Sequence, residues 1–202
     1  MTAAQRVNVW VRKVPSWAVY ILGAMIPVWY FWLAVSGQMG VEPINALERA
    51  LGLLAMQTLV VVLAVTPLRR WTGISLVSHR RALGLLAFFY VCCHLAVWLL
   101  LDVQDPGRAW ADIVKRPYIT IGMAGFVLLL PLAATSNDRA LRKLGPVRWR
   151  RVHTLTYVIC VLGAVHYVMV QKVWEIEPLV YLALVLALVA TRLPRLRRRA
   201  AA

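Results

Sequence analysis

Uncharged apolar stretches and short charged segments alternate along the whole chain. Five stretches of 19 to 21 residues contain no Asp, Glu, Lys or Arg. Crossing the hydrocarbon core of a bilayer takes about 20 predominantly apolar residues in a helix that rises about 1.5 Å per residue. We therefore predict a transmembrane helix in each of these stretches: Trp17–Val35, Ala50–Leu68, Ala82–Leu101, Pro117–Asn137 and Val152–Gln171.

A sixth candidate, Pro178–Thr191, is shorter, with 14 uncharged residues. It spans a bilayer if it tilts little and if the side chain of Arg192 reaches along the helix to the interface. With this helix, the pattern predicts an all-α membrane protein: a six-helix transmembrane bundle that forms one domain over residues 1–202. The expected helices cover residues 16–35, 50–68, 82–101, 117–136, 152–171 and 177–192.

Composition and charge fit this picture and orient the bundle. With 61% hydrophobic and 15% charged residues, and a mean hydropathy of +0.70, the chain is too apolar for an ordinary soluble domain. The net charge of +15 is concentrated in both terminal segments and in every second connecting segment. The positive-inside rule then predicts that both termini are cytoplasmic. The basic tail Arg192–Ala200 is interpreted as an orientation signal beside anionic lipid, and no nucleic-acid partner is expected.

A cleaved signal peptide is an alternative interpretation of the first apolar stretch. Arg12 and Lys13 precede it, and Ala34–Ser36 has the small-x-small form of a cleavage site. The stretch is long for a signal-peptide core, and its removal would break the alternation of charge. We therefore expect it to remain as the first helix.

Two histidines lie deep inside predicted helices. His94 lies 13 residues after Arg81 in the third helix, and His166 lies 15 residues after Arg151 in the fifth. Both helices enter from the cytoplasmic side, so the two rings lie about 20 and about 22 Å into the bundle. A hydrogen bond between helices would explain either one alone. Two imidazoles at one level of a helix bundle also suit bis-histidine haem ligation, which favours a haem between helices three and five.

The other histidines and the cysteines are less informative. His153 lies only two residues after Arg151, and the nearest histidine in helix three is His79, outside the apolar stretch. A zinc site is disfavoured, because zinc needs three or four ligands in one small sphere and these histidines are spread in depth. The cysteines do not form the C-x-x-C-H signature of covalent haem attachment, and we expect them to pack as small apolar side chains: Cys92, Cys93 and Cys160.

Several segments, taken together, resemble a known family. They are "RRALGL", "CCHL", "RPYITIG", "TSNDRALRKLGPVRWRRVHTLTY" and "VHY", in this order between about Pro67 and Tyr167. The chain resembles the ferric reductase-type transmembrane domain and, more closely, the MsrQ family of haem-binding membrane subunits in bacterial methionine sulfoxide reductase systems. Six spans with cytoplasmic ends agree with that family.

The resemblance implies an electron-transfer subunit in the bacterial inner membrane. In that family, electrons come from the quinone pool or a cytoplasmic flavin reductase. They pass through b-type haem, with FMN also bound, to a periplasmic molybdopterin-containing methionine sulfoxide reductase that repairs oxidised periplasmic proteins. The partner carries out the sulfoxide reduction. No G-x-G-x-x-G fingerprint occurs in this chain, so a nicotinamide site of its own is not expected.

The resemblance also implies roles for individual residues. His94 and His166 match the outer haem ligands. His153 matches a third histidine of the family and is also expected to be a haem iron ligand, and one or two b-type haems are expected. Arg80 and Arg81 match an arginine pair linked to flavin binding. Two guanidinium groups suit a flavin phosphate, although positive-inside anchoring explains them equally well. The resemblance gives His79 no role, and we expect it to be an interfacial residue.

Three other functions remain open from the sequence. The chain could be the haem anchor of another periplasmic redox enzyme, a difference that only the partner decides. It could be a small ion or metal transporter, but the predicted helix interiors lack the acidic residues that such a path uses. As a purely structural scaffold, it would leave the matching depth of the two histidines unexplained.

Overall fold

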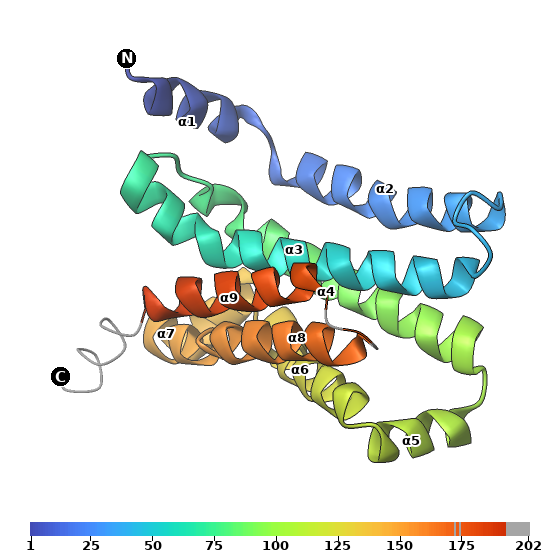
Figure 1. Cartoon of the computed structure of the whole chain (residues 1–202). Coiled ribbons are helices and arrows are strands. Elements are labelled where there is room, and N and C mark those ends of the chain that lie inside the picture. Colours follow the sequence, from blue (N-terminus) through green and yellow to red (C-terminus); the bar gives the residue numbers. More distant parts are fainter. Residues whose placement is uncertain (172, 174, 193–202) are drawn as a thin grey trace.

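The computed structural model describes residues 1–171, 173 and 175–192, and these residues form a bundle of helices (Figure 1). Residues 193–202, which include all of the basic tail except Arg192, lie outside the described residues, so the interpretation of that tail stays a prediction. In chain order the elements are α1 (Ala3–Lys13), α2 (Ser16–Val35), α3 (Pro43–Thr72), the 3₁₀ turn η1 (Val77–His79), α4 (Arg80–Val97), the π-helical turn η2 (Trp98–Val103), α5 (Pro106–Lys115), α6 (Pro117–Ala134), α7 (Asp138–Val152), α8 (Leu155–Val170) and α9 (Ile176–Ala190).

The described helices confirm an all-α protein with several membrane-spanning candidates. Four helical segments are long and apolar enough to cross a bilayer: α2, α3, the continuous segment Val77–Val103, and α6. Together α7 and α8 make a fifth if they count as one span bent by 42°. At 15 residues, α9 is apolar but shorter. The chain is therefore a multi-pass membrane protein, while the six-span bundle with cytoplasmic termini stays a prediction.

Helix α3 is longer than the uncharged stretch from which the second helix was predicted. The residues that begin and end it lie outside that stretch. Helix α3 begins with Pro43 in its first turn, where a missing N–H removes no helical hydrogen bond. It ends at Gly73, whose backbone is left-handed (φ 76°) and whose N–H bonds to the carbonyl of Arg69. A left-handed glycine is a common way to end a helix. The prediction missed these extra turns because charged residues at both ends of α3 limit the uncharged stretch.

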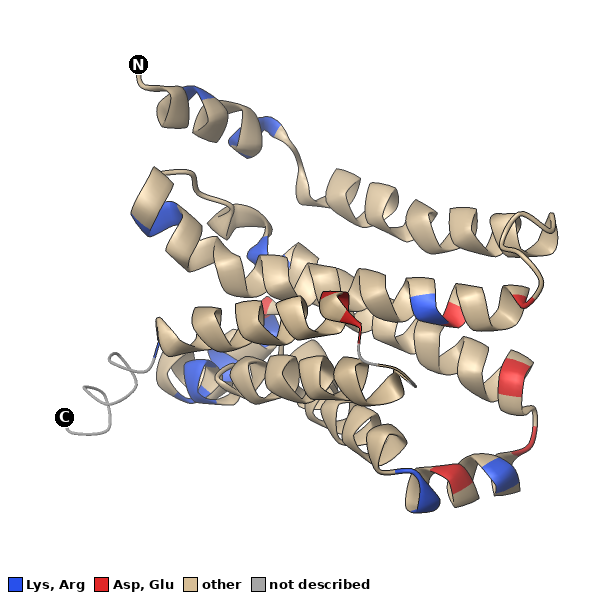
Figure 2. Cartoon of the chain, viewed as in Figure 1, with Lys and Arg blue, Asp and Glu red and all other residues tan. Residues whose placement is uncertain are grey.

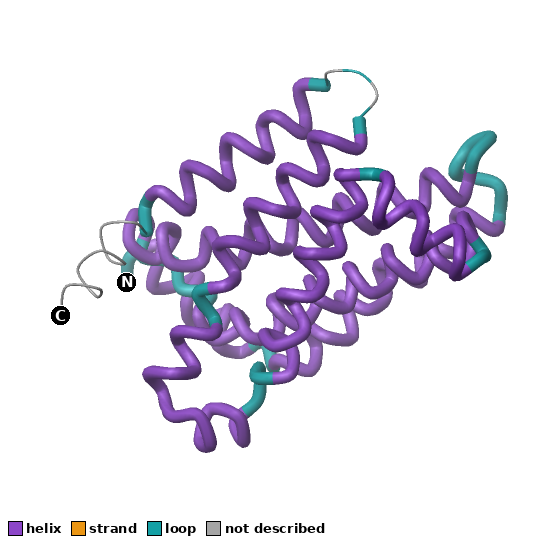
Figure 3. Tube along the Cα trace, turned by 90° about the horizontal axis from the view of Figure 1, so that it is seen from below, coloured by secondary structure: helices purple, strands orange, loops and turns teal. Residues whose placement is uncertain are grey.

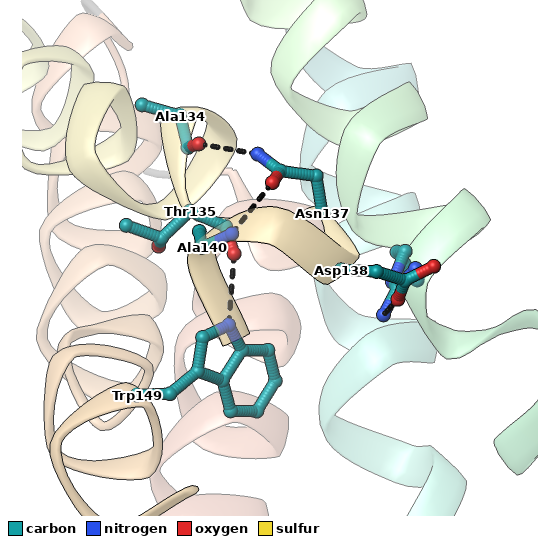
Figure 4. Close-up of polar contacts among 7 residues, drawn as sticks. Ala134, Thr135, Asn137, Asp138, Ala140 and Trp149 are labelled. Atoms are coloured by element: carbon teal, nitrogen blue, oxygen red, sulfur yellow. Dashed lines mark hydrogen bonds and ion pairs between the residues drawn. The ribbon is translucent and has the colours of Figure 1, made fainter. Parts of the chain in front are cut away.

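Two of the charged segments between the predicted spans fold into helices, α5 and α7. The side chain of Asp105 accepts a hydrogen bond from the N–H of Arg108 and so caps α5. Asn137 caps α7 in the same way by accepting from Ala140, as Figure 4 shows. Helix α7 is interrupted at Gly145, which has a φ of 72°. Short polar helices of this kind have no long apolar stretch, so hydropathy alone misses them. Helix makes up nearly the whole of the described trace in Figure 3.

The core lies where α3, α4, α6, α8 and α9 meet. Cys160 and Ala164 of α8 are fully buried against Leu63 of α3 and Val185 of α9. The three cysteines are free thiols, and Cys160 packs as a small apolar side chain, as predicted. The pairs α3 with α4 and α6 with α8 make the most extensive helix contacts. These two pairs are the ones that carry the deep histidines.

A proline in α2 creates a connection to α4. Pro27 has no N–H, so the carbonyl of Gly23, four residues earlier, loses its helical partner. The Tyr90 hydroxyl of α4 donates a 2.9 Å hydrogen bond to that carbonyl. In the apolar interior of a membrane protein, a neighbouring side chain that satisfies such a carbonyl makes the proline tolerable. Many of the other large apolar side chains of α2 are exposed, as expected for a helix that faces lipid.

Basic residues gather at one end of the bundle, here called the basic end. It contains the last turn of α3 with Arg69 and Arg70, the first turn of α4 with Arg80 and Arg81, and helix α7. Figure 2 shows Lys and Arg concentrated there and most Asp and Glu at the opposite end. The bundle is thus electrically asymmetric along its length.

Candidate functional site

The structure brings together the two histidines that the sequence placed at one depth. His94 on α4 and His166 on α8 have ring centroids 6.3 Å apart, and their planes make an angle of 74°. They lie more than half-way along helices that start at the basic end, so the pair is nearer the opposite end. This outer pair is the central feature of the candidate site.

Each ring of the outer pair is oriented by a backbone carbonyl of another helix. His94 Nδ1 lies 2.9 Å from the carbonyl oxygen of Glu48 in α3, and His166 Nδ1 lies 2.8 Å from that of Tyr118 in α6. A carbonyl oxygen only accepts, so Nδ1 is the donor and carries the hydrogen in both rings. In a neutral imidazole, Nε2 then keeps its lone pair. Metal-bound histidines are usually held in this way through the other ring nitrogen.

A glycine four residues after each of these carbonyls makes room for the ring. A Cβ atom at Gly52 would lie 3.2 Å from Nδ1 of His94. One at Gly122 would lie only 2.9 Å from Nδ1 of His166, a separation that real Cβ atoms essentially never show. The imidazoles therefore rest directly on the backbones of α3 and α6. The same arrangement of carbonyl, glycine and imidazole occurs twice, once in each extensive helix pair.

The separation of the rings fits a bis-histidine iron. A metal–imidazole bond of about 2.0 Å and an imidazole radius of about 1.1 Å, taken on both sides of a metal, place the ring centroids roughly 6.2 Å apart. The observed separation is 6.3 Å. Two neutral imidazoles with Nε2 lone pairs form the donor set of a low-spin b-type haem. The residues present therefore fit a haem iron.

His153 is held in a different way. Its ring stacks on Trp149, with centroids 3.8 Å apart, and its Nε2 lies 3.1 Å from Oγ1 of Thr135. The Thr135 hydroxyl donates to the carbonyl of Pro131 at 2.6 Å, which leaves His153 Nε2 as the donor. Trp149 in turn donates from Nε1 to the Thr135 carbonyl (Figure 4). In this conformation the lone pair of His153 is on Nδ1, the reverse of the outer pair.

His79 is buried beneath α1, and the interfacial position expected from the sequence stays a prediction. It is 8% exposed, and its Nε2 lies 2.9 Å from the carbonyl oxygen of Val11 in α1. Asn8 of α1 also donates to the Gly73 carbonyl and accepts from the N–H of Ser75. His79 is buried because α1, which hydropathy did not predict, packs over the turn before α4. Its contacts give it a structural role in holding α1.

A cavity of about 500 Å³ opens among the helices at the basic end, and we call it the basic cavity. Four arginines line it, Arg80, Arg81, Arg150 and Arg192, together with His153. None of its lining residues, within the described part of the chain, is Asp or Glu. Its apolar wall includes Leu59, Val62, Phe88, Leu129, Leu132 and Ile159. The cavity combines an apolar wall with a cationic surface.

The two neighbouring arginines that the sequence singled out have different surroundings. Arg81 Nη2 lies 2.8 Å from a carboxylate oxygen of Asp138, so this ion pair connects α4 to the start of α7. The hydrogen bond from Arg81 holds the pKa of Asp138 below its usual range. Among the described residues, no carboxylate forms a comparable ion pair with Arg80. Arg80 is thus the better placed of the two to bind an anion.

Arg192 does not extend to the interface, contrary to the sequence prediction. Its side chain is buried, with 7% of the residue exposed, and Nη2 donates a 2.8 Å hydrogen bond to the carbonyl oxygen of Leu63 in α3. That carbonyl lacks its helical partner because Pro67, four residues later, has no N–H. The freed acceptor inside the bundle draws the guanidinium inward. Sequence reasoning did not connect Pro67 with Arg192.

Comparison with known proteins agrees with the sequence and with the histidine geometry. Residues 50–164 match the family model described as "Ferric reductase like transmembrane component". Curated relatives from Brucella anthropi, Brucella ovis and Brucella canis are each 46% identical over 180 residues, which covers 89% of this chain and 81% of the relative. Each is named "Protein-methionine-sulfoxide reductase heme-binding subunit MsrQ". The chain therefore belongs to the MsrQ family of haem-binding subunits, within the ferric reductase-like transmembrane proteins.

Proposed function

We propose that this chain is a b-type cytochrome of the bacterial inner membrane that supplies electrons to a periplasmic methionine sulfoxide reductase. The partner is a molybdopterin-containing enzyme, and the electrons come from the quinone pool or from a cytoplasmic flavin reductase. Membership of the MsrQ family supports the role. The observation that carries the proposal is the outer pair, two imidazoles 6.3 Å apart whose Nδ1 atoms are both bonded to backbone carbonyls.

In this proposal His94 and His166 hold the iron of a b-type haem. When bound, the haem supplies reversible one-electron chemistry. The protein fixes both ring orientations, because each Nδ1 has a partner on a helix other than its own. By the positive-inside rule the basic end faces the cytoplasm, which places the outer pair in the periplasmic half of the six-span bundle. That position suits delivery of electrons to a periplasmic partner.

The proposal is tested by the visible spectrum of the purified protein in detergent, reduced with dithionite and compared with the air-oxidised form. We expect a sharp b-type α band, with pyridine haemochrome typing as haem b. His94→Ala or His166→Ala is expected to remove most of the low-spin signal. His79→Ala, which changes a histidine that bonds to α1, serves as the matched control and keeps the signal. A full signal in both ligand variants contradicts the assignment.

We further propose that the basic cavity holds a second planar cofactor. FMN fits, with Arg80 and Arg81 beside its phosphate, because a guanidinium offers paired charge-assisted hydrogen bonds to phosphate. A second b-type haem is the other candidate, with His153 as a ligand. His153 lines the cavity, but its bond to Thr135 would have to be exchanged for a bond to iron.

Cofactor content separates these two candidates. Joint substitution Arg80→Ala and Arg81→Ala is expected to lower the flavin released on denaturation several-fold and to leave the outer haem intact. His153→Ala is expected to lower the haem-to-protein ratio only if a second haem is present. If the flavin content of the arginine variant is unchanged, Arg80 and Arg81 do not bind flavin. Their role is then to orient the bundle in the membrane.

A further inference from the structure

Helix α1 lies at the basic end of the bundle, beside the end of α3 (Figure 1). It docks through one face, which carries Ala4, Asn8 and Val11. A Cβ atom at Gly73 would lie 3.5 Å from that of Ala4, and the Asn8 side chain donates to the Gly73 carbonyl at 2.9 Å. The Val11 carbonyl accepts a 2.9 Å hydrogen bond from Nε2 of His79. These contacts fix which side of α1 is turned toward the bundle.

A second face of α1 is apolar and is not covered by the described part of the chain. Val7 and Trp10 each precede a docking residue by one position, which turns them about 100° around the helix. Val14 follows at the C-cap. All three side chains are exposed, and Trp10 has 69% of its surface accessible. We call these three residues the apolar face of α1.

A third face of α1 is basic. Three exposed residues each follow a docking residue by one or two positions, which places them about 100–200° around the helix in the other direction: Arg6, Arg12 and Lys13. Within the described residues, none of them pairs with a carboxylate, and residues 1–41 contain no Asp or Glu. Lys13 Nζ lies 4.9 Å from the centroid of the Trp10 ring, so the basic and apolar faces meet at the indole.

We infer that α1 is an interfacial anchor that binds anionic lipid. Its apolar face enters the boundary between acyl chains and headgroups, and its basic face binds the headgroup phosphates. A helix with a basic face, and with a tryptophan on its apolar face, has the composition of helices that bind to membrane surfaces. Its position agrees, because Lys13 ends α1 and Ser16 begins α2, a helix long and apolar enough to span the bilayer.

Two other arrangements would explain the same three faces. The docking contacts could hold α1 without any help from lipid, or a second copy of the chain could cover the apolar face. The charge favours lipid, because a second copy would bring the same basic residues against each other, whereas anionic headgroups complement them. The experiment must therefore vary the charge of the lipid and the number of copies separately.

The test measures hydrogen–deuterium exchange of the α1 amides by mass spectrometry, with the full chain in lipid nanodiscs that hold one copy each. One set of discs contains phosphatidylcholine, and the other an equal mixture of phosphatidylcholine and phosphatidylglycerol. The basic-face variant carries Arg6→Gln, Arg12→Gln and Lys13→Gln together. Its matched control removes two arginines and one lysine from exposed positions of α7, with the changes Arg139→Gln, Arg142→Gln and Lys143→Gln.

We expect the α1 amides of the wild type to exchange more slowly in the anionic discs, by about tenfold or more at low salt. Each Lys or Arg near an anionic surface contributes about fivefold to binding, and salt screens this attraction. The basic-face variant loses the difference between the two lipids, and the α7 control keeps it. Unchanged exchange in α8 shows that the variants are folded.

The apolar face is tested by Trp10→Ser, which is expected to speed exchange of the α1 amides several-fold in both kinds of disc. Trp110→Ser is the matched control, because Trp110 of α5 is 68% exposed but lies in another helix. Asn8→Ala, which removes a docking contact, is also expected to speed exchange and shows that these amides report the attachment of α1.

Three results would overturn the inference. Equal α1 exchange in neutral and anionic discs would mean that protein contacts alone hold the helix. A lipid difference that persists in the basic-face variant would mean that these three charges do not recognise the headgroups. Protection of α1 that arises only in discs loaded with two copies would identify a second copy as the cover of the apolar face.

Discussion

At the scale of single residues, the outer pair is defined as much by two glycines as by two histidines. Gly52 and Gly122 each leave a carbonyl four residues earlier open to an imidazole from the neighbouring helix. The depth of His94 and His166 was predictable, because both occur in uncharged stretches at known distances from flanking arginines. The glycines were not, since their role depends on the relative rotation of two helices, which one sequence does not reveal.

We predict that Gly122→Ala displaces the His166 ring and weakens the low-spin haem signal. The added Cβ would lie 2.9 Å from Nδ1 and 3.0 Å from Cε1 of that ring, so the ring or the helix must move. Overpacking of this kind destabilises proteins by about 1–3 kcal/mol. The α band and the thermal midpoint in detergent measure both effects. Gly125→Ala in the same helix is the control, because its nearest contact is an ordinary 3.8 Å; equal effects of the two variants would contradict the prediction.

At the scale of elements, short polar contacts join helices that hydropathy treats as independent. Tyr90 and Arg192 each donate to a carbonyl freed by a proline, Pro27 in α2 and Pro67 in α3. The apolar stretches predicted where most long helices lie, but they gave no sign of α1, α5 and α7, which lie outside them. Those helices are short and amphipathic or polar, and caps such as Asp105 and Asn137, not apolar length, define their starts.

The ion pair between Arg81 and Asp138 predicts a pH dependence for the attachment of α7 to α4. The pKa of Asp138 is lowered in the folded protein by the hydrogen bond from Arg81. Its contribution to stability is therefore present above the pKa of the unfolded chain, about 4, and is lost as the pH falls through the lower folded pKa. Because both side chains are exposed, the effect is small and is screened by salt.

This is measured by thermal unfolding in detergent across the acidic range at low and high salt. Asp138→Asn is expected to remove part of the acid-dependent loss of stability at low salt, and Arg139→Gln, a change at the neighbouring position, is the control. A wild type and an Asp138→Asn variant with superimposable pH profiles would show that the ion pair does not stabilise the protein.

At the scale of the whole molecule, the sequence predicted an all-α multi-pass protein and its family, and both are confirmed. The number of spans was harder to predict, because α9 has 15 residues and α7 joins α8 at a 42° bend. Length and composition therefore identify four spans, or five with the bent pair. Packing of α9 against α3 and α8 makes the sixth span reasonable, but this follows from contacts that hydropathy does not contain.

We predict six spans with both termini in the cytoplasm, on the basis of the alternating charge. Fusions of a reporter that is active only in the cytoplasm, placed at either terminus, are expected to be active. The same reporter inserted after Val35 is expected to be inactive, because the α2–α3 connection lies on the opposite side. An inactive C-terminal fusion with an active N-terminal one would establish an odd number of spans.

The use of main-chain carbonyls to hold both imidazoles has a consequence for how the protein can evolve. A substitution at Glu48 or Tyr118 changes a side chain but leaves the carbonyl that His94 or His166 uses. The basicity and orientation of the two prospective ligands therefore depend on the positions of the helix backbones. Single substitutions at Glu48 or Tyr118 are expected to change them little. Relatives that need a different midpoint potential must obtain it elsewhere, through the polarity around the haem or through small shifts of whole helices.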